Sequence, residues 1–430
     1  MKSYKLFLFI IGIFIFPKFS FYFVSDFFCV YILLRHSKRI VFHNDLLRIV
    51  FIALFLLAIL TILGQLYYGV LKPFWAYHLL RIPLYYYASI TLLRVSGVSK
   101  ETLVKYMLIV LLIALSGNWI ELYFNEYFPS FFYGLKVESF LDAGGLKQVP
   151  YDFELGYRSS GYYANFQESG FLSLIGFIVS LYFILDKKKG SLVYLMSALV
   201  LVESIFGIIS SGSRSALIGV VVSTIVFYIS SFIFFKRKEK FIKMTVLLFF
   251  MGILLIAIIS LLLENEDLKS RLLLLSNTFL LLQGETPSSL SKSFDQIILP
   301  DNSWVMLFGD GIQPWTTFGV SSDVGYVQLL WGTGILGLIV FATLYFICII
   351  RSASALKRSQ DLFYVVPLSL FIYLIIYGIK GNYFIGIHGG GDIAIFFLAV
   401  VMWYRPLSSK KSSRLILRQL RFVKNYNLEK

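Results

Sequence analysis

The chain has 430 residues, of which 58% are hydrophobic and 18% aromatic, and this composition excludes a protein that is soluble as a monomer. Its formal net charge is +15, with the basic residues concentrated in the connections between apolar segments. The two cysteines, Cys29 and Cys348, lie far apart inside apolar segments, which excludes a disulfide framework. No Cys or His residues are spaced as metal ligands, so we expect no metal and no cofactor.

Apolar runs of roughly 20 residues recur along the chain, the length that crosses about 30 Å of hydrocarbon as a helix. The runs lack the residue-by-residue alternation of an outer-membrane β-barrel. The sequence therefore predicts an all-α, polytopic integral membrane protein with about twelve transmembrane helices. In chain order the helices are expected near residues 5–16, 20–34, 47–69, 74–94, 103–120, 169–185, 191–210, 214–235, 244–263, 324–350, 362–379 and 391–404.

Two long loops interrupt this series, near 121–168 and 264–323. Within the second loop, the segment 267–284 is too short and too basic to span a membrane, and we expect a helix lying in the membrane interface. The predicted organisation is a helical bundle over 1–404, followed by a basic tail over 405–430.

Basic residues predict the orientation of the bundle. Clusters of Lys and Arg follow the second, fourth, sixth, eighth and tenth predicted spans and continue into the tail. By the positive-inside rule these connections and both termini are cytoplasmic, and the two long loops lie on the opposite face. The positive charge therefore indicates topology and contact with anionic lipid, and we expect no nucleic-acid partner.

Two arginines on the non-cytoplasmic side are candidates for binding phosphate. Arg158 lies near the end of the first long loop, three residues before Gly161, and Arg214 opens a predicted span directly after Ser213. A guanidinium offers a planar fork to phosphate oxygens, and a helix N-terminus also favours an anion. Small neighbours such as Gly161 and Ser213 let a bulky ligand approach the backbone. The alternative for each arginine is an anchoring role at the membrane interface.

Three side chains on the same face are candidate acids or bases, namely Asp323, Glu168 and His388. Asp323 begins a predicted span, where an N-cap role is the alternative, and His388 lies in a glycine-rich loop, where it can equally be a solvated residue. Tyr326 and Lys380 are further candidates for substrate binding.

Four motifs in order resemble those of the bacterial O-antigen polymerase family, within the broader O-antigen ligase and polymerase group. They are R-x-x-G at 158–161, SGSRSALIG at 211–219, LFGDGI at 307–312 and SSDVGYVQLLWGTGILG at 321–337. The resemblance implies a polyprenol-dependent (C-type), metal-independent glycosyltransferase in the bacterial inner (cytoplasmic) membrane. Such an enzyme transfers a growing glycan from undecaprenyl diphosphate to a lipid-linked repeat unit on the periplasmic face.

The same resemblance implies the partners and the residue roles. The partners are undecaprenyl-diphosphate-linked glycans and membrane lipids, and a chain-length regulator is a further candidate. Arg158 and Arg214 would stabilise charge on the diphosphate leaving group, and Asp323, Glu168 or His388 would act as the base. The product is O-antigen, capsule or another polysaccharide.

Two other functions remain as alternatives. The ligase branch carries a histidine near the start of the span after the long loop, where this chain has Asp323, and this difference favours a polymerase over a ligase. A flippase or polysaccharide exporter is an alternative from another class, and Arg81, inside a predicted span, is the feature that fits a conduit. Arg81 is equally compatible with a lipid phosphate or a buried carboxylate as its partner.

Overall fold

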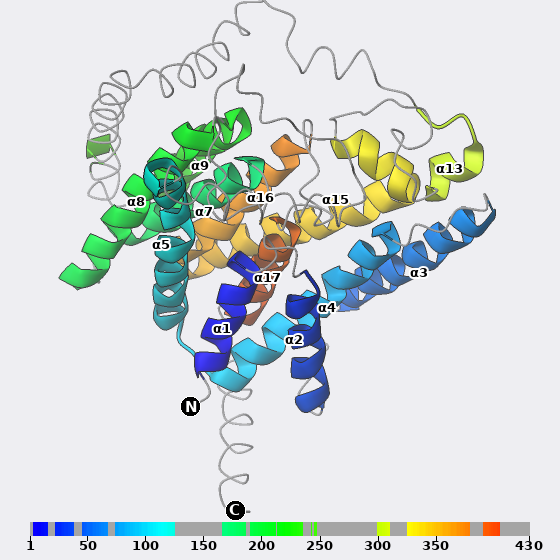
Figure 1. Ribbon diagram of the computed structural model, residues 1–430, viewed down its shortest axis with the longest axis horizontal. Helices are drawn as coiled ribbons and strands as arrows, with labels where there is room; N and C mark the ends of the chain where they lie inside the picture. The colour runs from blue at the N-terminus through cyan, green and yellow to red at the C-terminus, as the bar shows by residue number, and fades with distance from the viewer. Residues whose placement is uncertain are drawn as a thin grey trace, which may run out of the picture.

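The computed structural model describes most of the predicted spans, and every regular element in its described part is a helix (Figure 1). The described residues are 3–15, 22–37, 45–67, 74–124, 166–185, 190–211, 213–234, 242, 245–246, 299–309, 325–378 and 390–404. The helices are α1 (Ser3–Phe14), α2 (Tyr22–Arg35), α3 (Asp45–Tyr67), α4 (Phe74–Ser96), α5 (Lys100–Phe124), α7 (Phe166–Leu185), α8 (Ser191–Ser211), α9 (Arg214–Phe234), α13 (Ser303–Phe308), α15 (Gly325–Ser359), the 3₁₀ helix η4 (Leu362–Tyr364), α16 (Val365–Tyr377) and α17 (Gly390–Trp403).

A helix is present at every predicted span that lies within the described residues. Six of the helices are long and apolar enough to cross a membrane, namely α3, α5, α7, α8, α9 and α15. This supports a membrane-embedded, all-helical protein, whereas the count of about twelve spans remains a prediction. The span near 244–263 lies almost entirely outside the described residues, and so do the interfacial segment 267–284 and the tail 405–430.

Helices α15 and α13 differ from the sequence prediction. The predicted span near 324–350 continues as helix to Ser359, because the residues after the apolar run include the good helix formers Ala, Leu, Lys and Arg. Helix α13 falls within the predicted long loop and has 6 residues, too few for a periodic pattern to reveal it. Its start is fixed by Asn302, whose side chain accepts a hydrogen bond from the Trp304 amide at 2.8 Å.

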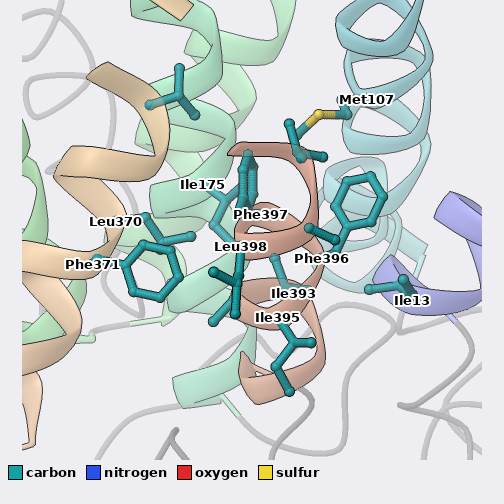
Figure 2. Close-up of a cluster of buried hydrophobic side chains, with 14 of the residues drawn as sticks. Ile13, Met107, Ile175, Leu370, Phe371, Ile393, Ile395, Phe396, Phe397 and Leu398 are labelled. Atoms are coloured by element: carbon teal, nitrogen blue, oxygen red, sulfur yellow. The ribbon is translucent and has the colours of Figure 1, made fainter. Parts of the chain in front are cut away.

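Helix α17 lies at the centre of the bundle. Its 14 residues span roughly 21 Å, which is short for a membrane crossing, and residues 391–401 are all buried. Figure 2 shows its side chains surrounded by Ile13 of α1, Met107 of α5, Ile175 of α7 and Leu370 of α16. A helix that is apolar on all sides is expected inside such a bundle.

Helices at the edge of the bundle expose an apolar stripe instead. On α9, the exposed residues recur every three or four positions, which places them on one helix face: Ile218, Val221, Ile225, Ile229 and Phe232. A face of this kind is stable against lipid chains and unstable against water, in agreement with a membrane-embedded protein.

A buried ionic cluster joins α2, α4 and α17. Arg81 of α4 contacts Asp26 of α2 through Nε–Oδ1 at 3.0 Å and Asp392 of α17 through Nη2–Oδ2 at 2.7 Å. Nη2 also donates to the Tyr85 hydroxyl at 3.0 Å, and the Tyr77 hydroxyl donates to Asp26. Both carboxylates lie near the N-terminal ends of their helices, as Arg81 does in α4, so these three helices begin at the same end of the bundle.

The opposite end of the bundle has its own polar contacts. Lys100, at the start of α5, pairs with Asp361, just before η4, at 2.6 Å. The Tyr404 hydroxyl, directly after α17, donates to the carbonyl oxygen of Val98, directly after α4, at 2.5 Å. Helices α4 and α17 therefore end where α5 and α16 begin, which agrees with the alternating direction of the predicted spans.

We expect Arg81→Met to destabilise the protein by about 3–5 kcal/mol, because it leaves two buried carboxylates without their cation. The measurement is thermal unfolding of the purified protein in detergent. Arg94→Met, at the exposed end of the same helix, is the matched control and should have little effect. Equal loss of stability in the two variants would contradict a special role for the buried cluster.

Candidate functional site

Helices α7 and α8 approach one another through a seam of glycine and serine. A Cβ added at Gly176 of α7 would lie 2.4 Å from the Ser204 Oγ, and one added at Gly207 of α8 would lie 2.3 Å from the Ser173 Oγ. Small residues allow such close approach, which is a frequent basis of helix association in membranes. The serines satisfy their hydroxyls within their own helices, as Ser173 donates to the Ser169 carbonyl at 2.7 Å and Ser204 to the Val200 carbonyl at 2.6 Å.

Glu168 lies in the first turn of α7, at the end of this seam, and its side chain is buried. The neighbouring Ser169 donates to the Asn118 side-chain oxygen of α5 at 2.8 Å. A carboxylate in the first turn of a helix is favoured by the helix dipole. The start of α7 thus carries a buried carboxylate next in sequence to the polar contact with α5. The rest of α7 is mostly apolar and buried.

The start of α9 lies directly against the start of α7. A Cβ added at Gly170 would lie 2.4 Å from the Ser213 Cβ and 3.2 Å from the Ser211 Oγ, so no larger residue fits between the two helices. Ser213 is buried, and its hydroxyl lies 3.0 Å from that of Ser215 and 3.4 Å from the Ala216 amide. Arg214 is the first residue of α9, and its side chain lies outside the described part of the structure.

Helices α15 and α16 reach the same end of the bundle. Tyr326, in the first turn of α15, donates its backbone amide to the Gly378 carbonyl oxygen at 3.1 Å. Its hydroxyl donates to the Ile375 carbonyl at 2.5 Å. One turn below, the Tyr373 ring lies 6.2 Å from the Phe171 ring of α7, which links α16 to the helix that carries Glu168.

The first three residues of the LFGDGI motif, Leu307–Gly309, lie against the WGTG motif of α15. Helix α15 is broken at Gly334, which has φ 66° and ψ −173°, and α13 ends at Gly309 with φ 72°. A Cβ at Gly334 would lie 2.2 Å from the Leu307 carbonyl oxygen, and one at Gly309 would lie 2.4 Å from the Thr333 amide nitrogen. Glycine is required at both positions by the positive φ and by the contact of backbone with backbone. Residues 307–309 of the second predicted loop are thereby fixed to the first part of α15.

The structure brings some of the predicted site residues together and leaves others outside its described part. The starts of α7 and α9 place Glu168, Ser213 and the backbone of Arg214 at one end of the bundle, and Tyr326 lies at the same end through its contacts with α16. The remaining candidates, Arg158, Gly161, Asp323, Lys380 and His388, lie outside the described residues. Their roles remain predictions.

Asp26 and Asp392 are buried charged residues that the sequence analysis did not select. The signal for both was a single carboxylate inside an otherwise apolar run, which in a membrane helix requires a partner. Arg81 was selected, and the structure gives it the buried carboxylates as partners. Among the described residues, no three His, Cys, Asp or Glu side chains are grouped as they would be around a metal ion.

We expect Gly334→Ala to release α13 from α15. An alanine at this position has an unfavourable positive φ, which costs about 1–3 kcal/mol, and its Cβ overlaps the Leu307 carbonyl. The measurement is the protease sensitivity of residues 299–309, which should rise. Gly190→Ala is the matched control, because a Cβ there meets open space at an ordinary φ. Unchanged sensitivity in Gly334→Ala would contradict the docking.

Comparison with known proteins assigns no family to the chain. No protein-family model matches it, and no curated protein matches it in sequence. The function is therefore argued from the residues and contacts described above.

Proposed function

We propose that the chain is a polysaccharide polymerase of the bacterial inner membrane, of the O-antigen polymerase kind. In this proposal it transfers a growing glycan from undecaprenyl diphosphate to the terminal sugar of a lipid-linked repeat unit, on the non-cytoplasmic face. The observation that carries the proposal is the contact between the starts of α7 and α9 at Gly170 and Ser213. It places Glu168 and the first residue of α9, Arg214, at one end of the bundle, although they are far apart in sequence.

A lipid diphosphate leaving group requires positive charge where its oxygens become more negative. Arg214 opens α9, where free backbone amides and the helix dipole also favour an anion. Gly170 lets α7 and α9 pack closely in this region, and the buried hydroxyls of Ser211 and Ser213 make it polar. Arg158, in the loop that leads into α7, is the second proposed cation. Cations fixed in place before the reaction stabilise such a transition state more than mobile ones do.

The acceptor sugar hydroxyl requires a base within reach. Glu168 is the described carboxylate closest in sequence to the Gly170–Ser213 contact, and it lies in the turn of α7 that precedes it. Asp323 and His388 precede the first residues of α15 and α17 by two positions each and remain alternative bases. Tyr326 and Lys380 are proposed to contact the glycan.

The two alternative functions differ from the polymerase in different ways. A ligase would use the same leaving group and differ in its acceptor, so the contacts described here suit both enzymes. A flippase or exporter was favoured by Arg81, but this arginine lies among Asp26, Asp392 and two tyrosines of three helices. Those contacts give Arg81 a role in joining helices, which weakens the case for a conduit.

We expect Arg214→Ala to lower the rate of chain elongation by about 100- to 1,000-fold, the loss typical of removing one group that stabilises a developing negative charge. Single lipid-linked repeat units should accumulate, and the measurement is the length distribution of glycans extracted from the producing strain. Arg94→Ala is the control, an exposed arginine at the other end of the bundle. Normal polymer lengths in Arg214→Ala, at equal protein level, would remove Arg214 from the site.

The extracted glycans also separate the alternative functions. Accumulation of single repeats on the lipid carrier indicates a polymerase, and full-length chains still attached to the carrier indicate a ligase. Intermediates trapped on the cytoplasmic face indicate a flippase.

We also expect the purified protein to elongate lipid-linked repeats without added divalent metal, because charge stabilisation is assigned to arginines. The measurement is polymer formation in the presence of EDTA. Loss of activity in EDTA that magnesium or calcium restores would contradict the metal-independent mechanism.

A further inference from the structure

A cavity of about 180 Å³ lies at the end of the bundle opposite Glu168 and Ser213. It is formed where α3 begins and where α15 and α17 end, and this is the end at which Lys100 pairs with Asp361. The lining residues are Leu46, Ile347, Ile350, Arg351, Ser354, Ala355, Arg358, Val401 and Met402.

One face of α15 supplies most of this lining. Five of the lining residues are spaced three, four or seven positions apart, as residues on one side of a helix are. They are Ile347, Ile350, Arg351, Ser354 and Arg358. Along this face the chemistry changes from apolar at Ile347 and Ile350 to polar at Arg351 and Ser354, and ends at the exposed Arg358. The apolar part lies towards the middle of the bundle and the basic part towards its end.

The change from apolar to basic side chains along α15 matches the order of groups along a phospholipid in the adjacent leaflet. A phospholipid has its acyl chains towards the membrane centre and its phosphate at the surface. The two arginines lie about 10 Å apart along the helix axis, since they are separated by two turns. The half-buried Arg351 is therefore placed for the phosphate, and Arg358 for the outer part of the headgroup. Guanidinium groups bind phosphate oxygens through paired hydrogen bonds.

The walls of the cavity distinguish a lipid from a free phosphate ion. Val401 and Met402 of α17 face the α15 residues across the cavity, and Leu46 of α3 completes it. An inorganic phosphate gains nothing from aliphatic walls, whereas the glycerol and upper acyl chain of a lipid bury apolar surface there. Basic pockets between membrane helices on the cytoplasmic side are a known type of anionic-lipid site.

We propose that this cavity binds the headgroup of an anionic phospholipid, with its phosphate held by Arg351 and the outer part of the headgroup contacted by Arg358. The site is separate from the proposed glycan transfer at the other end of the bundle and does not depend on it. The bound lipid joins the start of α3 to the ends of α15 and α17 and so acts as part of the structure at that end.

The test measures binding of phosphatidylglycerol and of phosphatidylcholine to the full-length protein in detergent by native mass spectrometry. We expect phosphatidylglycerol to bind at least tenfold more tightly than phosphatidylcholine. The double variant Arg351→Gln/Arg358→Gln should lose about tenfold or more in affinity for phosphatidylglycerol and little for phosphatidylcholine, as expected when a charge-assisted hydrogen bond is lost. Lys357→Gln is the matched control, an exposed basic residue of the same helix that does not line the cavity.

A second variant tests the cavity without changing its charge. Met402→Trp fills the space between α17 and α15 and should reduce phosphatidylglycerol binding while both arginines remain. Equal losses in Lys357→Gln and in the double variant would indicate general attraction to a basic surface and overturn the proposal. Full displacement of the lipid by millimolar inorganic phosphate would assign the arginines to a free anion and overturn it as well.

Discussion

The need to satisfy every charge within the low-dielectric interior governs the arrangement of this bundle. Arg81 is buried in α4 and is neutralised by carboxylates from α2 and α17, which are remote from it in sequence. An unpaired charge there would cost several kcal/mol, so the three helices are held at one level and in one direction. The position of α17 matters most, because this buried helix contacts α1, α4, α7, α15 and α16. One ionic cluster thus fixes the orientation of the helix around which the others are arranged.

The two ends of the bundle differ in the side chains that they bring together. At one end, glycine and serine bring α7, α8 and α9 into close contact, so that Gly170, two residues after the buried Glu168, meets Ser213 from a separate segment. At the other end, α3, α15 and α17 leave a cavity with basic and aliphatic walls. The first arrangement suits an anionic leaving group and an acceptor hydroxyl, and the second suits a lipid of the opposite leaflet. The proposed polymerase would therefore contact membrane lipid in two distinct ways.

Much of the fold was predictable, because apolar runs of membrane length are strong signals in a sequence of this composition. The start of α9 at Arg214 was predicted from its Ser-Gly-Ser-Arg motif, and the start of α7 was predicted to within a few residues. The partners of Arg81 were not predictable, since which of several distant carboxylates it meets is decided by tertiary packing. The break in α15 was not predicted either: Gly332 and Gly334 occur in an apolar run that reads as one continuous span. For the candidate site, residue types indicated Glu168 and Ser213, but the close contact between α7 and α9 depends on Gly170, which no local pattern marked.

The junction of α13 with α15 limits how the second long loop can vary. Leu307 and Gly309 meet Thr333 and Gly334 atom against atom along the main chain, with no side chain between them to absorb a change in length. An insertion or deletion between Leu307 and Gly309 would move these backbone atoms out of contact with α15. The backbone from Leu307 to Gly309 is therefore held in a fixed register against α15.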